Sequence, residues 1–408
     1  MKILIYSHFF PPETGAASIR MRYLAEALKP LGAEVRIINP VPNYPNGKTL
    51  SGIKRFFYRK DNITFLPIYV PRIDSPIKRL LSYLTYFFSS LIYSLVKFRK
   101  HDFIISSSPP IITALAAAIL SKIKGSIFIL DIRDIWPDIG IELGIIKSKH
   151  TARILFSIEK FIVSKATKIT VTAEGDKKNL VKKGVSEKKI TVIYNGADTR
   201  IFKPSTPQRR ITIRKRFNLP ISKKILVYFG SFNQGMNDID ILIDSLKQLE
   251  NFKELVHFVA IGNGSQKEKL LNNIKGYISY SSFDSSQISE LAEIISACDL
   301  SLIPRKFIKK DTGGNIPVKC FESWAAGIPV MVSTIKDTEI MEIVLKSKAG
   351  FIVEPGKADI FANKIKSVIV KQNLEKYGKN GRKYVEENFD RNKLAKDYLN
   401  LLLKITFK

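Results

Sequence analysis

The sequence is poor in cysteine, in histidine and in acidic residues. Its two cysteines, Cys298 and Cys320, stand in apolar stretches. We expect reduced thiols in a cytosolic protein, because a secreted chain of this size more often carries disulfides. Four scattered histidines without a cysteine cluster predict no structural zinc site. The first residues read as a strand that runs into Pro11 and Pro12, so we expect a folded domain there and no export signal.

Basic residues outnumber acidic ones by 66 to 37, which gives a formal net charge of +29. Residues 1–205 carry 33 Lys or Arg against 15 Asp or Glu, and the remainder carries 33 against 22. Such an excess predicts a polyanionic partner, either nucleic acid or an anionic membrane. Aromatic and apolar residues accompany the cations, as in residues 53–60, and no nucleic-acid motif is recognisable. The composition therefore favours a membrane surface and no nucleic-acid partner.

One apolar run, Leu80–Val96, falls short of a membrane span. It has 17 residues and contains five Ser or Thr, whereas a span needs about 20 mainly apolar residues. Large apolar residues share one helical face of the run, and cations flank both of its ends. The face consists of Leu80, Leu84, Phe87, Phe88, Leu91 and Leu95, and the cations are Lys78, Arg79, Lys97, Arg99 and Lys100. The pattern predicts a helix lying in a membrane interface, with a buried core helix as the alternative.

Apolar strands alternate with helical stretches in both halves of the chain. The first half reads as strands from residues 2–6 to 190–193, and the second half from 225–230 to 350–353. Alternation of this kind builds doubly wound parallel sheets, so we predict an α/β protein with two Rossmann-like domains. The ligands of such sheets bind beyond the carboxyl ends of the strands. We therefore expect the site in a cleft between two facing domains.

The length of 408 residues also exceeds one ordinary core. We predict an N-terminal domain over residues 1–205 and a C-terminal domain over 206–385. Residues 386–408 are expected to form a helix that packs back on the N-terminal domain. The segment 195–222, rich in Pro, Arg and Thr, is the predicted connection.

The most informative motif is residues 315–330, Asn-Ile-Pro-Val-Lys-Cys-Phe-Glu-Ser-Trp-Ala-Ala-Gly-Ile-Pro-Val. Its apolar spacing predicts a helix, with Lys319 and Glu322 on one face near the N-terminal end. Such an end attracts phosphate, and a nearby carboxylate can accept hydrogen bonds from sugar hydroxyls. We read this as a site for a nucleotide diphosphate and its ribose, with Asn315 and Ile316 at its edge. An ordinary surface pair of Lys319 and Glu322 is the alternative.

Two strands of the first half run into candidate loops. Gly15 lies in the loop after the first strand, where backbone could approach a phosphate, although G-x-G-x-x-G is absent. Residues 131–138 follow another strand and concentrate three carboxylates with a guanidinium and an indole. Arg133 and Asp134 of this segment are candidates for orienting sugar hydroxyls. A salt-bridged loop is the alternative.

In the second half, the candidates are a glycine loop and a cation. Gly230, Ser231 and Gln234 follow the first strand, where backbone N–H groups could cradle a diphosphate. A plain glycine turn is the alternative. Arg305 follows the strand that ends at Ile303 and adds a permanent positive charge, unless it is simply solvated.

The order and spacing of these motifs resemble the retaining glycosyltransferases of family 4, over nearly the whole chain. Within that family, the sequence is most similar to bacterial surface-polysaccharide enzymes such as the L-fucosamine transferases. The motifs are H-F-F-P-P-E-T-G-A from His8, N-Y-P-N-G-K from Asn43, R-D-I-W-P-D from Arg133, Y-N-G-A-D from Tyr194 and P-V-K-C-F-E-S-W-A-A-G-I-P-V from Pro317. The resemblance implies the GT-B fold and transfer of a hexosyl or N-acetylaminosugar group from a nucleotide sugar with retained configuration. It implies no cofactor and no obligatory metal.

The resemblance carries over to the site only in part. Glu322 matches the second Glu of the family's E-x7-E pattern, which is expected on the ribose of the donor. The first Glu would fall on Gly314, so that contact to the donor sugar is missing. The basic pair that many members carry falls on Ser231 and Gln234, which weakens the usual phosphate clamp.

We therefore expect other cations to stabilise the leaving diphosphate, which can itself take the proton of the acceptor. Arg305 and Lys319 are the predicted cations, together with the glycine loop. From the first domain, Asp134, Arg133 and Gly15 are expected to orient the donor sugar and the acceptor.

The basic, aromatic surface over residues 48–100 is predicted to dock on the cytoplasmic leaflet. A polyprenyl-diphosphate-linked saccharide would present its sugar there, so we expect a peripheral protein of O-antigen or capsule biosynthesis. UDP is favoured only through the resemblance. A nucleotide-sugar 2-epimerase of the same fold and a degenerate membrane-binding protein without activity are the alternatives.

Overall fold

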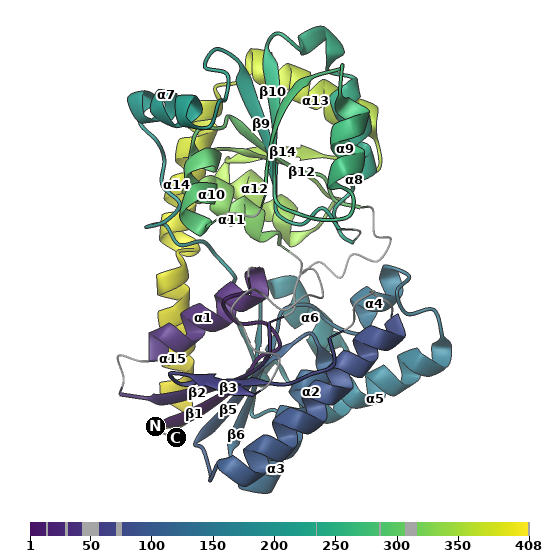
Figure 1. The fold of residues 1–408 in the computed structure, drawn as a ribbon, viewed down its shortest axis with the longest axis vertical. Helices are drawn as coiled ribbons and strands as arrows, with labels where there is room; N and C mark the ends of the chain where they lie inside the picture. The colour runs from purple at the N-terminus through teal and green to yellow at the C-terminus, as the bar shows by residue number, and fades with distance from the viewer. Residues whose placement is uncertain are drawn as a thin grey trace. The chain divides into compact units, whose positions relative to one another are not determined.

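A computed structural model of the chain describes residues 1–406 except 14, 29–31, 43–56, 71–75, 234, 285–286 and 307–315. The chain forms two compact units (Figure 1). Unit 1 comprises Met1–Asn195 and Asn392–Lys408, and unit 2 comprises Gly196–Arg391. The chain thus passes between the units twice, whereas the sequence placed boundaries at residues 205 and 385.

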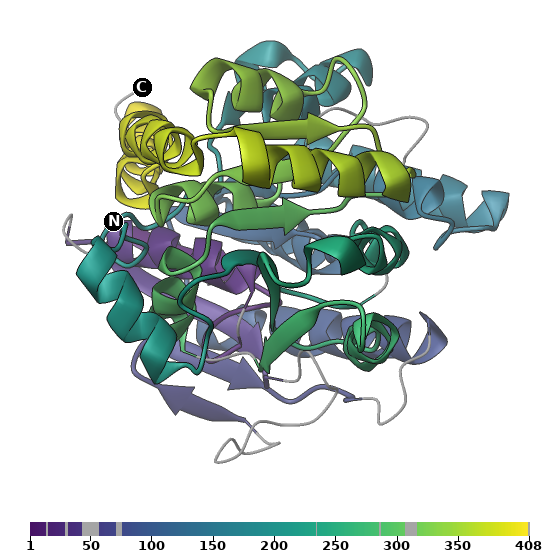
Figure 2. The same cartoon turned by 90° about the horizontal axis from the view of Figure 1, so that it is seen from above.

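Unit 1 is built on one sheet with helices on both of its faces (Figures 1 and 2). Its strands are β1 (Lys2–Tyr6), β2 (Glu34–Pro40), β3 (Tyr58–Lys60), β4 (Ile63–Leu66), β5 (Phe103–Ser108), β6 (Ile127–Ile132), β7 (Lys168–Val171) and β8 (Ile190–Val192). Its helices are α1 (Ala16–Leu28), α2 (Pro76–Lys97), α3 (Ile111–Lys124), α4 (Asp138–Glu142), α5 (Lys149–Lys165), α6 (Glu174–Lys182) and α15 (Arg391–Thr406). Among the described residues the sheet has eight strands in the order β3-β4-β2-β1-β5-β6-β7-β8, and each neighbouring pair is parallel except β3 with β4.

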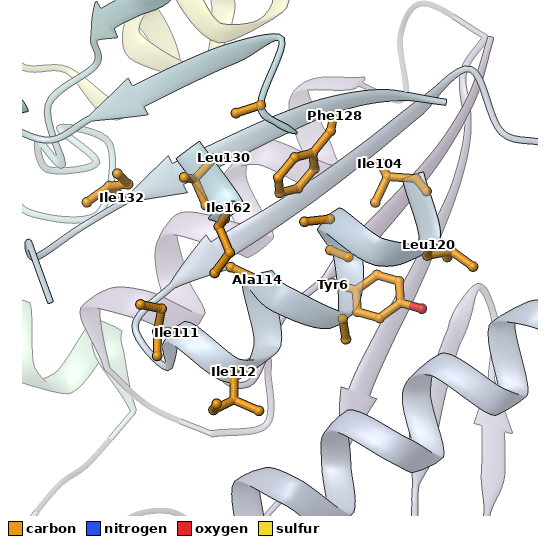
Figure 3. Packing of buried hydrophobic residues seen from close by; sticks show 14 of the residues in the cluster. Tyr6, Ile104, Ile111, Ile112, Ala114, Leu120, Phe128, Leu130, Ile132 and Ile162 are labelled. Atoms are coloured by element: carbon orange, nitrogen blue, oxygen red, sulfur yellow. The ribbon is translucent and has the colours of Figure 1, made fainter. Parts of the chain in front are cut away.

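Alternating side chains of the strands divide the core of unit 1 between the two faces of the sheet. On β1, Leu4 and Tyr6 join a cluster with α2, α3 and α5, while Ile3 and Ile5 join a cluster with α1 and α15. Figure 3 shows the first cluster, in which the alanine-rich α3 lies close against the strands. Small side chains permit this close approach. The last helix of the chain therefore completes the core of unit 1.

Helix α2 packs on the core with both polar and apolar residues and exposes a row of large apolar residues. Its polar residues face the core: the Tyr86 hydroxyl donates to the backbone oxygens of Ser7 (2.9 Å) and Ile38 (2.8 Å), and Tyr6 donates to Ser94 Oγ (2.6 Å). Large apolar residues cover the outer face, namely Ile77, Leu80, Leu81, Leu84, Phe88, Ile92 and Val96, all at least 36% exposed. The core-helix alternative is therefore wrong.

The predicted apolar face of this helix also needs a correction. Phe87, Leu91 and Leu95 are partly buried against the core of unit 1 and do not belong to the exposed face. Among the described residues, Ile77–Lys97 is the one stretch long and apolar enough by composition to cross a membrane. The predicted run was shorter because it was counted between Arg79 and Lys97, whereas Ile77–Lys97 includes these cations.

Unit 2 repeats the doubly wound design. Its strands are β9 (Lys224–Phe229), β10 (Val256–Ile261), β11 (Ser279–Phe283), β12 (Leu300–Ile303), β13 (Val330–Ser333) and β14 (Gly350–Val353). Its helices are α7 (Pro207–Arg216), α8 (Ile239–Lys247), α9 (Lys267–Ile274), α10 (Ile288–Ser296), α11 (Val318–Ala325), α12 (Glu339–Ser347), α13 (Ala358–Lys371) and α14 (Leu374–Asn388). The described strands are all parallel, in the order β11-β10-β9-β12-β13-β14. The prediction of two parallel α/β domains is confirmed.

The segment 195–222 is not a plain connection, because it contains α7. Thr206 caps this helix by accepting a backbone N–H, and Pro207 occupies its first turn. Arg214 is buried and pairs with Asp299 at 2.7 Å. The composition predicted a connection, but Arg214 fixes the helix to Asp299, the residue before β12.

Candidate active site

The strand order of unit 2 defines where a ligand should bind. From β9, the chain first adds β10 and β11 on one side and then returns to add β12 on the other side. Ligands of doubly wound sheets bind outside the carboxyl ends of the strands at such a switch point. Gly230 directly follows β9, and Arg305 lies two residues beyond the end of β12. Two of the predicted site residues therefore share this edge.

Hydrogen bonds tie the two loops of the β9/β12 switch point together. An isolated antiparallel bridge joins Asn237 to Arg305. The backbone N–H of Asp238 donates to the oxygen of Pro304 (3.0 Å), and that of Lys306 donates to the oxygen of Met236 (2.9 Å). The loop after β9 is thus fixed against the loop after β12.

Lys319, on the first turn of α11, reaches into the loop after β9. Its Nζ lies 3.9 Å from the ring centroid of Tyr228 and 3.3 Å from Asn237 Oδ1. Gly230 has φ +110°, and a Cβ there would come within 2.8 Å of Lys319 Cε. The absence of a side chain at Gly230 therefore makes room for the lysine and leaves backbone bare beside a cation.

Two further glycines of this edge escaped the sequence-based prediction. Gly262 (φ +128°) follows β10, and a Cβ on it would lie 2.0 Å from the backbone oxygen of Gly230. A Cβ on Gly264 (φ +154°) would lie 2.4 Å from the backbone carbonyl carbon of Phe232. Both let the loops after β9 and β10 touch. The signal was visible, because a Gly-x-Gly pair directly follows a predicted strand.

Burial shifts the ionisation of both predicted residues of α11. Burial lowers the pKa of Lys319 from 10.5 to about 7, against the opposing influence of Cys320 and Glu322. Burial also raises the pKa of Glu322 from 4.5 to about 7, although Arg391 and Lys319 oppose the shift. Glu322 is 8% exposed, so the alternative of an ordinary surface pair is wrong. Perturbed groups of this kind cluster at functional sites.

Arg305 is buried rather than solvated, with 6% of its surface exposed. Its backbone N–H donates to Ser333 Oγ (2.5 Å), which links it to the end of β13. Burial raises the pKa of the Cys320 thiol to about 12, although the Arg305 and Lys319 charges oppose the shift. The thiol is therefore protonated near neutral pH. The positive charge at this edge belongs to Arg305 and Lys319, and the cysteine supplies no thiolate.

The other predicted residues of unit 2 divide into three groups. Ser231 is exposed, and its Oγ accepts the backbone N–H of Asn233 (3.2 Å). Ile316 is buried just ahead of α11. Gln234 and Asn315 lie outside the described residues, as does Gly314, the position of the missing first Glu.

In unit 1 the switch point lies between β1 and β5, and Arg133 follows the neighbouring β6. Its Nε donates to Ser107 Oγ (2.9 Å), and its Nη2 donates to the oxygen of Pro109. Burial lowers the pKa of Arg133, against the influence of Asp134 and Asp131. Arg133 and Asp134 therefore lie at the predicted edge, with the guanidinium held by the loop after β5.

The salt-bridged alternative describes the rest of the 131–138 segment correctly. Asp131 is fully buried on β6 and pairs with Arg20 of α1 at 2.7 Å. Asp138 pairs with Lys183 at 2.5 Å. Of the three carboxylates that the sequence grouped, two hold the fold together.

Gly15 has φ +152° and nothing within 4 Å of the position of a Cβ. It immediately precedes α1, and its oxygen accepts the N–H of Ile19 (3.0 Å). Ser18 lies inside the helix, and its hydroxyl donates to the backbone oxygen of Glu13 (2.7 Å). In the described part of the chain, no group of three His, Cys, Asp or Glu residues could hold a metal ion.

Two family models, both of glycosyltransferases, match the chain. Residues 17–201 match glycosyltransferase family 4, and residues 223–371 match the glycosyl transferases group 1. The putative colanic acid biosynthesis glycosyl transferase WcaI of Escherichia coli (strain K12) is 23% identical over 413 residues, which cover 98% of this chain and 99% of that protein. The protein is a glycosyltransferase with the GT-B fold.

Solved structures support the fold of this glycosyltransferase over its whole length. Sucrose-phosphate synthase from Thermosynechococcus elongatus superposes with a TM-score of 0.75 at 18% identity, covering 99% of this chain and 98% of that one. Anabaena Alr3699/HepE, solved in complex with UDP-glucose, gives a TM-score of 0.70 at 17% identity, covering 99% and 100%. The predicted GT-B fold is confirmed.

Proposed function

We propose that this glycosyltransferase moves a sugar, with retained anomeric configuration, from a UDP-linked donor to a lipid-linked saccharide. The reaction would serve a surface polysaccharide such as O-antigen or capsule. The name of WcaI, which refers to colanic acid, supports this pathway class. The complex of HepE with UDP-glucose supports UDP as the nucleotide. An N-acetylated deoxysugar is the donor group that the sequence resemblance favours.

The observation that carries the proposal is the Lys319 amino group beside the bare backbone of Gly230. A diphosphate at the β9/β12 switch point would meet this ammonium and the Arg305 guanidinium. The negative charge of the diphosphate would also favour the protonated form of Lys319, whose pKa burial has lowered to about 7. Glu322, which follows Lys319 by three positions on α11, is the proposed acceptor of hydrogen bonds from the ribose hydroxyls.

In the proposed reaction, the bond between the sugar and the diphosphate breaks as the acceptor hydroxyl attacks the same face. The leaving diphosphate takes the proton of that hydroxyl, so no side-chain base is required. Lys319 and Arg305 stabilise the negative charge that grows on the diphosphate, which is the largest contribution that a fixed site can make. Arg133 and Asp134 of unit 1 are proposed to orient the acceptor. The mechanism requires no metal ion and no cofactor.

We further propose that the protein works on the inner face of the cell membrane, bound through α2. The outer face of α2 is apolar over the length of the helix, and residues 76–100 contain five cations and no acidic residue. Apolar surface flanked by cations is typical of helices that lie in an anionic interface. The hydroxyls and backbone contacts of the inner face hold α2 on the sheet, which favours an in-plane helix over a span. Residues 48–56 and 71–75 of the predicted surface lie outside the described residues.

A donor panel tests the reaction. Wild type and Glu322→Gln would be given UDP-, GDP- and dTDP-sugars, with and without a polyprenyl-diphosphate-linked sugar, and nucleotide release and product anomer would be measured. We expect acceptor-dependent release of UDP with retained configuration, reduced about 100-fold in Glu322→Gln. Glu375→Gln, at a surface carboxylate that is 75% exposed, is the control and should match wild type. Epimerisation of free nucleotide sugar without acceptor, or no turnover in a folded protein, would contradict the proposal.

A further inference from the structure

A buried histidine lies at the β1/β5 switch point of unit 1. His8 follows the end of β1 by two residues and is 4% exposed. Its Nδ1 is shielded from solvent and has no hydrogen-bond partner in the structure. Most buried polar atoms are paired, so an unpaired one at a ligand-binding edge needs an explanation.

Aromatic packing fixes the His8 ring without using its nitrogens. Phe9 and Tyr83 meet it edge to face with centroids 5.0 Å away, and Tyr86 does so at 5.3 Å. Tyr86 is itself held by its two hydrogen bonds to the backbone of Ser7 and Ile38. The imidazole is therefore held in one orientation, and its Nδ1 is left without a hydrogen bond.

The ring is neutral at physiological pH. Burial lowers the pKa of His8 to about 3, and the nearby Arg133 charge lowers it further. A neutral imidazole offers one donor and one acceptor, which matches a hydroxyl group and does not match a phosphate. The charges of this edge are also occupied, because Ser107 and Pro109 hold the Arg133 guanidinium. The chemistry is that of a site for an uncharged, polyhydroxylated ligand.

We propose that His8 binds a hydroxyl of the acceptor sugar and positions it for transfer. The inference rests on the proposed function, because it takes unit 1 as the acceptor-binding half. Binding would require side chains around the ring to shift and expose Nδ1, and it would then give this nitrogen the hydrogen bond that the protein withholds.

A second buried histidine provides a matched control. His101 is 6% exposed, packs edge to face on Phe98 at 5.3 Å, and precedes β5 at the amino-terminal edge of the same sheet. Burial lowers its pKa as well. It is about as buried as His8 but lies at the edge where doubly wound sheets do not bind ligands.

The experiment compares His8→Phe, His8→Asn and His101→Phe with wild type. A farnesyl-diphosphate-linked N-acetylhexosamine serves as the acceptor probe, and its dissociation constant, its KM, the affinity for UDP and the melting temperature are measured. We expect His8→Phe to weaken probe binding about tenfold or more while UDP affinity and melting temperature stay at wild-type values. His8→Asn, which keeps a neutral donor and acceptor, should recover part of the loss, and His101→Phe should leave probe binding unchanged.

Other outcomes would overturn the inference. Unchanged probe binding in His8→Phe, or an equal loss in His101→Phe, would make His8 a packing residue. A wild type that binds UDP but not the probe would also overturn it and leave the donor half of the proposed function standing. A wild type that binds the probe through His8 but transfers no sugar would contradict the proposed function alone.

Discussion

The β9/β12 edge of unit 2 and the β1/β5 edge of unit 1 hold equivalent places in two sheets of similar strand order. In unit 2, buried Arg305 and half-buried Lys319 bring positive charge beside glycines that leave the backbone uncovered. In unit 1, the corresponding edge holds the neutral ring of His8 and an arginine, Arg133, that already donates hydrogen bonds to Ser107 and Pro109. Under the proposals made above, the topology sets where a ligand binds, and a few side chains decide whether it is an anion or a neutral sugar.

The outer surfaces of the two units differ in a related way. Unit 1 exposes a continuous row of large apolar residues on α2, whereas the exposed apolar residues described in unit 2 lie apart, as with Ile211, Leu345 and Val370. Scattered apolar residues are normal on a protein surface, but a contiguous row marks an interaction site. The unit whose ligand-binding edge lacks free charge is thus the one suited to meet a lipid.

Removing the cation of unit 2 should have the largest effect. Lys319→Met should lower kcat/KM for the nucleotide sugar by about 100- to 1000-fold, because it removes a fixed charge from the leaving diphosphate. The same change should raise the melting temperature of the ligand-free protein, since burial disfavours the ammonium. Lys379→Met, at a lysine that is 75% exposed, is the control for both measurements. A stable Lys319→Met variant with wild-type kinetics would place the diphosphate elsewhere.

Removing the apolar row of unit 1 should have the next largest effect, and on a different measurement. Replacing Leu84, Phe88 and Ile92 with Gln should weaken sedimentation with anionic vesicles by about 100-fold, at about 1 kcal/mol for each half-buried side chain. Turnover of a soluble acceptor should change little, because the replaced side chains are exposed and lie outside the core. The matched control replaces Ile211, Leu345 and Val370 of unit 2 with Gln, and it should sediment like wild type. Equal binding by both triple variants would show that charge alone attracts the membrane.

How much of this comparison the sequence predicts depends on the kind of signal. Strand periodicity and the α11 motif predict both sheets and the Lys319–Glu322 pair, because they depend on local spacing. The role of Asp131 does not follow from local spacing, since its partner Arg20 is 111 positions away. His8 was missed for the same reason. Tyr83 and Tyr86 of α2 bury the His8 ring, and the residues next to His8 in the sequence do not predict these contacts.

Helix α2 shows a further limit of pattern reading. Its periodicity predicts an amphipathic helix but not which of its faces is turned inward, because Ser and Tyr can satisfy buried backbone groups as well as meet water. The hydrogen bonds of Tyr86 decide the matter in the folded chain. Residues 195–222 show the same limit, since their composition predicted a connection and not a helix whose Arg214 is buried.

The smallest expected effect, and the one that separates the two edges most directly, is their response to pH. Because burial raises the pKa of Glu322 to about 7, its side chain is protonated at pH 5 and loses its proton as the pH increases. The carboxylate is the better acceptor for the ribose hydroxyls, so UDP affinity should increase by up to about tenfold for each pH unit from 5 to 7. Above about 7, the free enzyme loses the Lys319 proton, and affinity should fall again. His8, with a pKa of about 3, adds no titration in this range, so acceptor binding should stay flat. Titrations of UDP and of the acceptor probe from pH 5 to 9 measure both curves.

The variant Glu322→Gln separates the titration of Glu322 from that of Lys319. It should abolish the rise below pH 7 and keep the fall above it, because Gln does not titrate. Its stability should follow linkage: the folded pKa of Glu322 lies above the ordinary 4.5, so the stability gained from protonation is present below about 4.5 and lost by about 7. Glu322→Gln should therefore stabilise the ligand-free protein at pH 8 and have little effect at pH 4. A flat UDP curve in wild type would mean that neither residue of α11 meets the nucleotide, and the contrast between the two edges would then lack its electrostatic basis.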